Sequence, residues 1–353
     1  MMTDPRDLAG LELPSLTVVV PALDARRQLE RSLAALLDDP DVGASRIVLV
    51  DDGSEDGTAT WAQGLGVRVL RTSRRRSGPA AARNLGVEHA APTEWLAFVD
   101  ADVVVEQGAL GRLVRAALAD GCVAAFGSYD DQPDDPGFTS LYVNLRHHAG
   151  HRVASLDADT FWSGLGVVRR DAFQQVGGFD PVRYPEPSVE DVELGLRLRA
   201  RGGRIARVPE AQARHLKRWT LAEALRVDVT RRALPWSQLM VEHPGAFRDL
   251  NVALSERVKA VLAAVFLGAA LGSLPPWIGR VPSLLAAGVT LLVAAWLSLP
   301  LLRIWARAAG PVFAVCALLL HQLHLTLAAV TFAWVRLTAP AWSATRRQAR
   351  DAS

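Results

Sequence analysis

The strongest constraint in this 353-residue sequence is a set of three long apolar stretches near its C-terminal end. They cover residues 258–274, 281–302 and 311–335. Each approaches the roughly 20 residues that a helix needs to cross a bilayer. Stretches with so little charge do not suit a bundle that faces water, which disfavours a buried hairpin in a soluble core. We therefore expect a membrane region of three helices over residues 257–340, followed by a basic tail at 341–353.

The positions of Arg and Lys predict how this region is oriented. Arg257 and Lys259 flank the first stretch, and Arg303 and Arg307 follow the second. Basic residues beside membrane helices stay in the cytoplasm, so we expect both sites there and the connection at 275–282 outside. A full crossing by the third stretch would place the basic tail outside. Crossing, re-entrant and interfacial placements therefore all stay open for that stretch.

Charge and cysteine content exclude several classes of protein. The chain has 39 Lys and Arg against 37 Asp and Glu, and this net charge of +2 argues against a general nucleic-acid binder. Its two cysteines, Cys122 and Cys316, lie far apart, which excludes a disulfide scaffold and a zinc site built from cysteines. The first residues include several acids and do not resemble a signal peptide. We expect a multi-pass protein of the cytoplasmic membrane with its front part in the cytoplasm.

Short β-rich runs alternate with amphipathic stretches in the part of the chain before the membrane region. This order predicts an α/β domain over residues 1–218, with a doubly wound, mainly parallel sheet. Ligands bind such sheets at the carboxyl ends of the strands. The expected strands are residues 16–20, 46–50, 67–71 and 95–99, and the expected helices are residues 26–37 and 58–64.

Two of the expected strands end in carboxylates. Asp51 and Asp52 follow one strand, and Asp100 and Asp102 follow another. Adjacent acids at a strand end are costly unless a cation or hydrogen-bond donors compensate. In extended chain, an Asp-x-Asp pair places both side chains on one face, where they can hold a divalent metal that also binds phosphate. For residues 51–57 a solvated turn is the alternative.

Two later segments carry further candidate site residues. Small residues at 78–86 would let the backbone approach a ligand, and Arg83 offers a fork suited to phosphate. The preceding run at 74–76 is expected to be a solvated loop for two of its three arginines. Glu190 and Asp191 are expected in the first turn of a helix capped by Ser188. In that position the helix dipole stabilises their negative charge. If they face a pocket, they could instead act as a general base.

Residues 219–256 form a predicted segment between the α/β domain and the membrane region. Its basic amphipathic pattern, which includes Trp236, fits a helix on the membrane surface or a helix packed on the sheet. His321, Gln322 and His324 interrupt the third apolar stretch. Polar groups at such positions face protein or a polar cavity, so we expect them to contact a lipid headgroup or the preceding helices.

The motifs of the α/β domain, taken in order, resemble those of the family 2 glycosyltransferases, which bind nucleotide sugars in a GT-A fold. The resemblance extends from Leu16 to Trp219 and rests on the order and spacing of several motifs. The matching segments are residues 18–24, 51–54, 81–86, 100–102, 176–180 and 190–193.

The resemblance implies a role for each matching residue on the donor side. Pro21, Asp51 and Asp52 would line the site for base and ribose. Arg83 would approach the donor diphosphate, and Asp100 would contact ribose or sugar.

The resemblance likewise implies the residues of the reaction centre. Asp102 would coordinate Mg²⁺ or Mn²⁺ at the diphosphate. Asp191 would be the catalytic base of a single inverting displacement, with Glu190 beside it. Trp162 would belong to the acceptor and leaving-group side.

Two segments depart from the family pattern. Asp24 stands where the family commonly has Asn near the base, so base preference is open. The sequence from His215 to Trp219 resembles the Gln-x-x-Arg-Trp motif of processive synthases, with His in place of Gln. Arg218 would help the diphosphate leave, and Trp219 would stack on a sugar. His215 would join the metal as a neutral imidazole, or would be a surface or interface residue.

These expectations combine into one functional hypothesis. The chain would be an inverting, metal-dependent glycosyltransferase that moves a sugar from a nucleotide-sugar donor to a lipid or lipid-linked acceptor in the membrane. A processive polysaccharide synthase is disfavoured, because the apolar stretches lie on one side of the α/β domain only. A catalytically silent membrane scaffold with the same fold and a nucleotidyltransferase are rival hypotheses.

Overall fold

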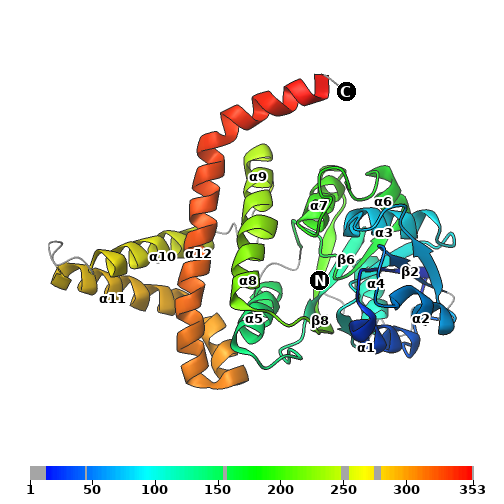
Figure 1. The fold of residues 1–353 in the computed structure, drawn as a ribbon, viewed down its shortest axis with the longest axis horizontal. Coiled ribbons are helices and arrows are strands. Elements are labelled where there is room, and N and C mark those ends of the chain that lie inside the picture. Colours follow the sequence, from blue (N-terminus) through cyan, green and yellow to red (C-terminus); the bar gives the residue numbers. More distant parts are fainter. Residues whose placement is uncertain (1–12, 44–45, 154–156, 248–253, 274–279, 352–353) are drawn as a thin grey trace. The chain divides into compact units, whose positions relative to one another are not determined.

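The computed structural model describes residues 13–43, 46–153, 157–247, 254–273 and 280–351. The chain divides into two compact units, Met1–Arg218 and Trp219–Ser353. The first unit is built around one sheet with helices on both faces, and the second is helical (Figure 1).

The sheet of the first unit has eight strands in the order β3-β2-β1-β4-β7-β6-β8-β5. The four expected strands are all present and pair in parallel, with β1 between β2 and β4. Beyond β4 the sheet is mixed, because β7 is antiparallel to both β4 and β6, and β5 is antiparallel to β8, whereas β6 and β8 are parallel. Only β7 and β5 run against the other six strands, so the expectation of a mainly parallel sheet is confirmed. The strands are β1 Leu16–Ala22, β2 Ile47–Asp51, β3 Arg68–Arg71, β4 Trp95–Val99, β5 Val103–Val105, β6 Ala124–Tyr129, β7 Leu165–Arg169 and β8 Ile205–His215.

Helices cover both faces of this sheet, which explains the continuous apolar runs of its central strands. Side chains of β1 alternate between the two faces, with Val18 in one core and Val19 in the other. Helices α1 and α4 pack on the first face, and α3, α6 and α7 pack on the second. The helices of this unit are α1 Arg26–Leu37, α2 Thr58–Gly64, α3 Pro79–Glu88, α4 Ala109–Ala119, α5 Phe138–Val153, α6 Arg170–Gln175 and α7 Glu190–Ala200.

The small residues of α3 pack against the sheet, and the close approach to a ligand expected for this segment stays a prediction. Ala80, Ala82 and Gly86 are buried in that helix. A Cβ atom on Gly86 would lie 2.4 Å from Cγ1 of Val19 and 3.1 Å from Cγ2 of Val50. The absence of a side chain at Gly86 therefore sets how closely α3, and Arg83 on it, approaches β1 and β2.

The second unit contains a segmented helix and three longer helices. The segmented helix comprises α8 Leu221–Val227, the π-helix η3 Asp228–Ala233 and α9 Leu234–Glu242. Both η3 and α9 pack against α12. The longer helices are α10 Leu254–Gly272, α11 Arg280–Leu297 and α12 Leu299–Asp351.

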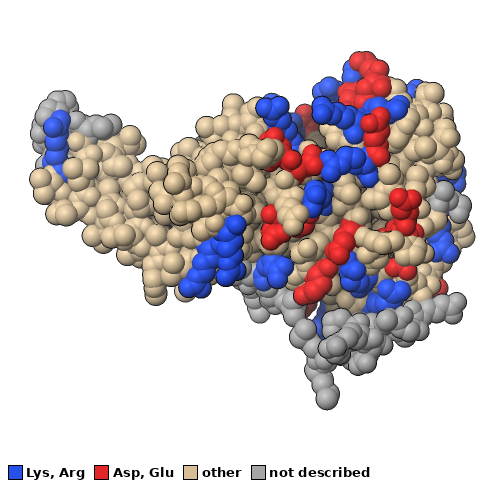
Figure 2. All heavy atoms as spheres, turned by 90° about the horizontal axis from the view of Figure 1, so that it is seen from below, with Lys and Arg blue, Asp and Glu red and all other residues tan. Residues whose placement is uncertain are grey.

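Two of the described helical stretches are long and apolar enough to cross a membrane. They are Arg280–Leu297 and Leu299–Ala339, with mean hydropathies of 1.7 and 1.8. Only 11% of the first and 33% of the most apolar part of the second are buried inside the protein, so much apolar surface is exposed. In Figure 2 the helices at the left show almost no charged side chains. The first expected stretch falls in α10, which is not one of these two and carries Glu256, Arg257 and Lys259 near its start.

Helix α12 joins the end of the second expected stretch to the third. It breaks only at Gly310, where φ is 87° and ψ is 168°, in agreement with the expected break before Pro311. The described backbone then continues as helix to Asp351, through the expected basic tail. The re-entrant turn considered for the third stretch is therefore not what the described residues form.

One polar residue of the third apolar stretch, His324, contacts the preceding helical segment. His324 Nδ1 lies 2.9 Å from Oδ2 of Asp228 in η3, and Arg232 donates to Oδ1 of the same carboxylate at 3.1 Å. The His321 ring packs between His324 and Trp305. Of the two expected environments, contact with the preceding helices is the one observed.

Replacing Gly86 with Ala should destabilise the fold. The added methyl group overlaps two buried valines, and overpacking of this kind costs about 1–3 kcal/mol. Gly64→Ala is the control, since a Cβ atom there meets nothing within 4 Å. Thermal unfolding of the full chain in detergent should show a lower Tm for Gly86→Ala and no decrease for Gly64→Ala. Equal Tm values for Gly86→Ala and the unmodified chain would contradict the packing argument.

Candidate active site

The buried guanidinium of Arg83 joins three segments of the first unit. Arg83 lies on α3 and is 3% exposed. Its Nη1 donates to Oε1 of Glu190 at 2.8 Å, and its Nη2 donates to Oδ1 of Asp100 at 2.6 Å. Burial disfavours the charged guanidinium, but Asp100, Glu190 and Asp191 outweigh burial and raise the pKa of Arg83. Arg83 therefore stays charged and connects the end of β4 to the start of α7.

Asp191 lies in the first turn of α7, where its carboxylate accepts three hydrogen bonds. Oδ2 accepts from the backbone N of Ser163 at 3.0 Å and from its Oγ at 3.2 Å, and Oδ1 accepts from the N of Val192 at 2.8 Å. Burial, followed by the negative charge of Glu190, raises the pKa of Asp191 to about 7. A carboxylate with this pKa is suited to take up a proton near neutral pH.

The expected helix start at residues 190–191 is confirmed, but the expected cap is wrong. The N-cap residue of α7 is Val189, and it makes no side-chain capping bond. Ser188 instead donates its backbone N–H to Oε2 of Glu190 at 2.9 Å. Glu190 thus accepts hydrogen bonds from the side chain of Arg83 and from the backbone of Ser188.

Asp102 faces His215 across the pairing of β5 with β8. The strands pair Val103 with His215, and the N of Leu216 donates to the backbone O of Asp102 at 2.9 Å. His215 Nε2 lies 3.4 Å from Oδ2 of Asp102. Burial acts to raise the pKa of Asp102, but His215 and Lys217 outweigh it and hold this pKa below its ordinary value.

The expected residues of the reaction centre therefore form one electrostatic group. Burial, and the neighbouring charges of Asp102 and Glu190, raise the pKa of Asp100 even though Arg83 acts in the opposite direction. In the same way, the charge of Glu190 raises the pKa of Asp191 and the charge of Arg83 lowers it. The members of the group are Arg83, Asp100, Asp102, Glu190, Asp191 and His215.

Asp51 and Asp52 are buried, and the protein itself occupies their oxygens. Asp52 accepts from Thr72 Oγ1 at 2.8 Å and from the backbone N–H groups of Ser77 at 2.8 Å and Gly78 at 2.9 Å. Asp51 Oδ1 accepts from the N of Ser54, and Oδ2 lies 2.9 Å from Nε of Arg71. A solvated turn, the alternative at this position, is therefore wrong for these two acids. They organise the loop at 72–78 and the start of α3.

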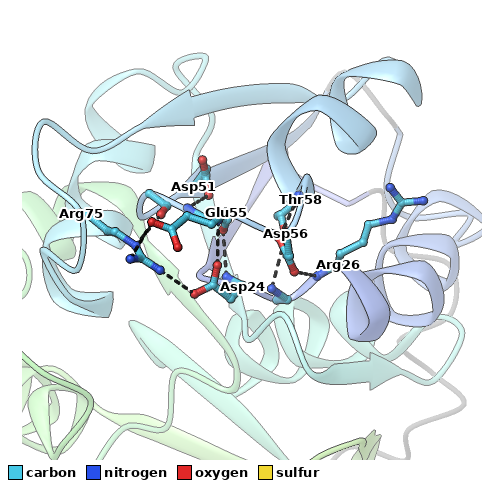
Figure 3. A network of polar contacts seen from close by, with 10 residues as sticks. Asp24, Arg26, Asp51, Glu55, Asp56, Thr58 and Arg75 are labelled. Atoms are coloured by element: carbon cyan, nitrogen blue, oxygen red, sulfur yellow. Dashed lines mark hydrogen bonds and ion pairs between the residues drawn. The ribbon is translucent and has the colours of Figure 1, made fainter.

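A second polar network surrounds Asp24 next to Asp51 (Figure 3). Asp24 has a positive φ of 48°, and its Oδ1 accepts from the N of Glu55 at 2.8 Å. Arg75 donates to Asp24 Oδ2 at 3.2 Å and to the backbone O of Gly53 at 3.0 Å, and pairs with Glu55 at 2.8 Å. One arginine of the basic run is thus held in place at the end of β2. Pro21, in β1, is partly exposed.

Trp162 belongs to a cluster of aromatic rings beside the reaction centre. Its ring lies 4.8 Å from that of Tyr129 and 4.9 Å from that of His151. Tyr129 also stacks on His215, with centroids 4.5 Å apart and planes 9° apart. Burial, followed by the charge of Arg207, lowers the pKa of His151 to about 3, so this imidazole is neutral.

The two residues expected at the leaving-group side fall on opposite sides of the unit boundary. Arg218 ends the first unit and is exposed, whereas Trp219 begins the second and is buried. The guanidinium of Arg232 lies 5.8 Å from the Trp219 ring. Their expected roles stay predictions.

The protein side chains offer a divalent cation only part of a coordination shell. Within the described part of the chain, no three His, Cys, Asp or Glu side chains gather as a metal site. Asp102 and His215 offer one oxygen and one nitrogen that face each other. Two ligands at right angles on an octahedral ion, each about 2.1 Å from it, lie about 3 Å apart, so this pair fits a cation whose other ligands come from phosphate or water.

Several side chains at the site carried no signal in the sequence analysis. Ser163 holds Asp191, Arg75 holds Asp24, and Asn144 contacts His215 Nδ1 at 2.6 Å. Each partner is 28 or more residues away in sequence. Of these residues, only Ser163 could have been noticed, because the Ser163-Gly164 turn directly follows Trp162.

Removing the charge of Arg83 should destabilise the first unit strongly. Arg83→Leu leaves the buried Glu190 and the partly exposed Asp100 without their cation, and breaking a buried pair costs up to about 3–5 kcal/mol. Arg83→Lys keeps the charge but loses the two-armed geometry, so an intermediate effect is expected. Urea unfolding of the full chain measures this, and a stability of Arg83→Leu equal to that of the unmodified chain would contradict the role of the ion group.

Comparison with known proteins agrees with this geometry. Residues 17–177 match the family model described as Glycosyl transferase family 2. The succinoglycan biosynthesis protein ExoA of Rhizobium meliloti (strain 1021) is 28% identical over 206 residues, which cover 54% of this chain and 60% of that protein. The match thus spans less than two thirds of this relative.

A solved structure shares the fold over most of the chain. The mannosyltransferase PcManGT of Pyrobaculum calidifontis, in complex with GDP-Man and Mn²⁺, has a TM-score of 0.51 and 20% sequence identity. The similarity covers 94% of this chain and 92% of that one. The family match assigns residues 17–177 to a glycosyltransferase domain of family 2, and the solved structure and the mixed sheet show that its fold is of the GT-A type.

Proposed function

We propose that this chain is an inverting, metal-dependent glycosyltransferase that transfers a sugar from a nucleotide-sugar donor to a lipid or lipid-linked acceptor. The observation that carries the proposal is Asp191, a partly exposed carboxylate with a pKa of about 7, set beside Arg83, Asp100 and Glu190. Perturbed acids gathered at the ends of strands are typical of catalytic sites.

Asp191 would act as the general base. It takes the proton of the acceptor hydroxyl while that oxygen forms a bond to the anomeric carbon of the donor sugar. The bond from this carbon to the diphosphate oxygen breaks, and the nucleoside diphosphate leaves with the bonding electrons. A single displacement of this kind inverts the anomeric centre. Ser163 fixes the carboxylate by donating to Oδ2, and Oδ1 accepts from the backbone N of Val192 in the same helix.

Asp102 and His215 would hold Mg²⁺ or Mn²⁺, and such an ion would offset the negative charge of the departing diphosphate. Their facing oxygen and nitrogen support this assignment, as does the Mn²⁺ that accompanies GDP-Man in the Pyrobaculum mannosyltransferase. Arg83 fixes Asp100 and Glu190 in the same group. Its expected approach to the diphosphate stays a prediction, as do the base and ribose roles of Pro21, Asp51 and Asp52. Trp162 is proposed to line the acceptor side.

The second unit would hold the enzyme in the cytoplasmic membrane with its catalytic domain on the cytoplasmic side. The exposed apolar surface of α11 and α12 supports this placement, because lipid is the solvent that such a surface requires. An anchored enzyme and a lipid acceptor share one plane, which raises their effective concentration. The anchor therefore supports a membrane-bound acceptor.

The rate of transfer should rise with pH as Asp191 ionises around pH 7. Glu190→Gln removes the neighbouring negative charge, so the ascending limb of the kcat/KM profile should move to lower pH. Asp191→Asn should abolish transfer while the protein stays folded. A profile that Glu190→Gln leaves unchanged would contradict the assignment of this limb to Asp191.

The same group makes stability depend on pH. The folded-state pKa of about 7 exceeds the ordinary value of 3.8, so the folded protein holds a proton that the unfolded chain releases between these values. The stability from neutral Asp191 is therefore complete below about pH 4 and is lost as pH rises through about 7. The decrease in Tm across this range should be smaller in Asp191→Asn.

Removing the residues after Glu256 should separate donor chemistry from lipid transfer. The truncated protein is expected to keep metal-dependent release of nucleoside diphosphate from the correct nucleotide sugar, found by screening a panel, and to lose transfer to lipid. Circular dichroism checks that it folds, and Asp102→Asn in the same truncated protein is the inactive control. Transfer to lipid at the full-length rate would contradict the anchoring role, and release of pyrophosphate would indicate nucleotidyl transfer.

A further inference from the structure

Three side chains fix the imidazole of His215 on three sides. Nδ1 lies 2.6 Å from Oδ1 of Asn144 on α5, and the ring stacks on Tyr129 at the end of β6. Nε2 points to Oδ2 of Asp102 at 3.4 Å. The ring cannot rotate without breaking the contact with Asn144, so its two nitrogens have separate roles.

The contact with Asn144 determines which nitrogen carries the proton. A side-chain amide oxygen only accepts, so Nδ1 is the donor and carries the hydrogen. Nε2 is then the nitrogen that faces the Asp102 carboxylate, 3.4 Å from Oδ2. The lone pair of Nε2 and this carboxylate are both acceptors, so they need a cation between them, either a proton or a metal ion.

Two residues on one face of helix α5 hold this arrangement in place. Asn144 is 2% exposed, and its Oδ1 makes the contact with His215 while its Nδ2 has no hydrogen-bond partner. His148, four residues later and on the same face of the helix, contacts the backbone O of Tyr129 through Nδ1 at 2.7 Å. One helix face thus supports both the imidazole and the ring on which it stacks.

We propose that Asn144 is a positioning residue that fixes His215 as the Nδ1–H tautomer, so that Nε2 and Asp102 together receive the divalent cation. This inference rests on the proposed function, which assigns Asp102 and His215 to the metal. It adds the residue that selects the metal-binding nitrogen. Residues that hold the second nitrogen of a metal-bound histidine commonly change metal affinity 10–100-fold.

The test measures Mn²⁺ binding to the full-length protein in detergent, by the EPR signal of free Mn²⁺, with and without inorganic pyrophosphate. Asn144→Leu cannot accept from Nδ1, so its affinity for Mn²⁺ should decrease about 10–100-fold. Asn144→Asp should keep or increase the affinity, because a carboxylate also only accepts. Catalytic turnover plays no part in this measurement.

Asn144→Asp also distinguishes the two orientations of the amide. If the amide were turned over, Nδ2 would donate to Nδ1, and Nε2 would carry its proton toward Asp102. Asn144→Asp would then weaken Mn²⁺ binding as much as Asn144→Leu, and the inference would be overturned. Unchanged affinity in Asn144→Leu would overturn it as well.

Two further variants separate this inference from its basis and from general destabilisation. Asn84→Leu removes a different amide, which bridges the backbone of Phe179, and should lower stability without changing Mn²⁺ affinity. A loss of Mn²⁺ affinity in Asn84→Leu equal to that in Asn144→Leu would contradict a specific role for Asn144. His215→Ala tests the metal assignment itself. If His215→Ala loses Mn²⁺ affinity and Asn144→Leu does not, only the role of Asn144 fails. If His215→Ala binds Mn²⁺ normally, the metal site of the proposed function fails too.

Discussion

The proposed reaction centre depends on one buried cation, the guanidinium of Arg83. Burying a guanidinium is unfavourable unless carboxylates compensate, and Asp100 and Glu190 do so from segments 17 and 107 residues away. The ion group therefore fixes the end of β4 and the start of α7 against α3 at one point. Asp191 and Asp102 are neighbours of these two acids in sequence, so the same contact also places the proposed base and a proposed metal ligand.

Much of the fold could be predicted because the central strands are buried on both faces. Runs such as those of β1, β2 and β4 have almost no polar residue, and their order with the helices indicated the parallel half of the sheet. The other half gave weaker signals. Strand β6 begins with two alanines, and β8 contains Pro209 and four charged or amide side chains. Residues of low β propensity become strands there because β7 and β8 supply partners that local sequence does not encode.

The same division between local and distant determinants applies to the site. Acids at strand ends and at a helix start are local patterns, so Asp100, Asp102, Glu190 and Asp191 could be named from the sequence. The contacts that neighbouring side chains make could not be predicted from the sequence. Asp52 looked equivalent to Asp102, yet its oxygens hold the loop at 72–78. Such assignments depend on loop geometry. In the second unit, too, Gly310 and Pro311 marked a break correctly, whereas the partner of His324 was set by tertiary packing.

The hydrogen bonds from Ser163 to Asp191 and the burial of this carboxylate act on its pKa in opposite directions. These bonds favour the ionised carboxylate, yet the pKa of Asp191 still lies near 7 because burial outweighs them. The pKa of Asp191 therefore depends on how much water surrounds its carboxylate. Anything that admits solvent beside Asp191 turns it into an ordinary acid, and anything that expels solvent makes it a stronger base.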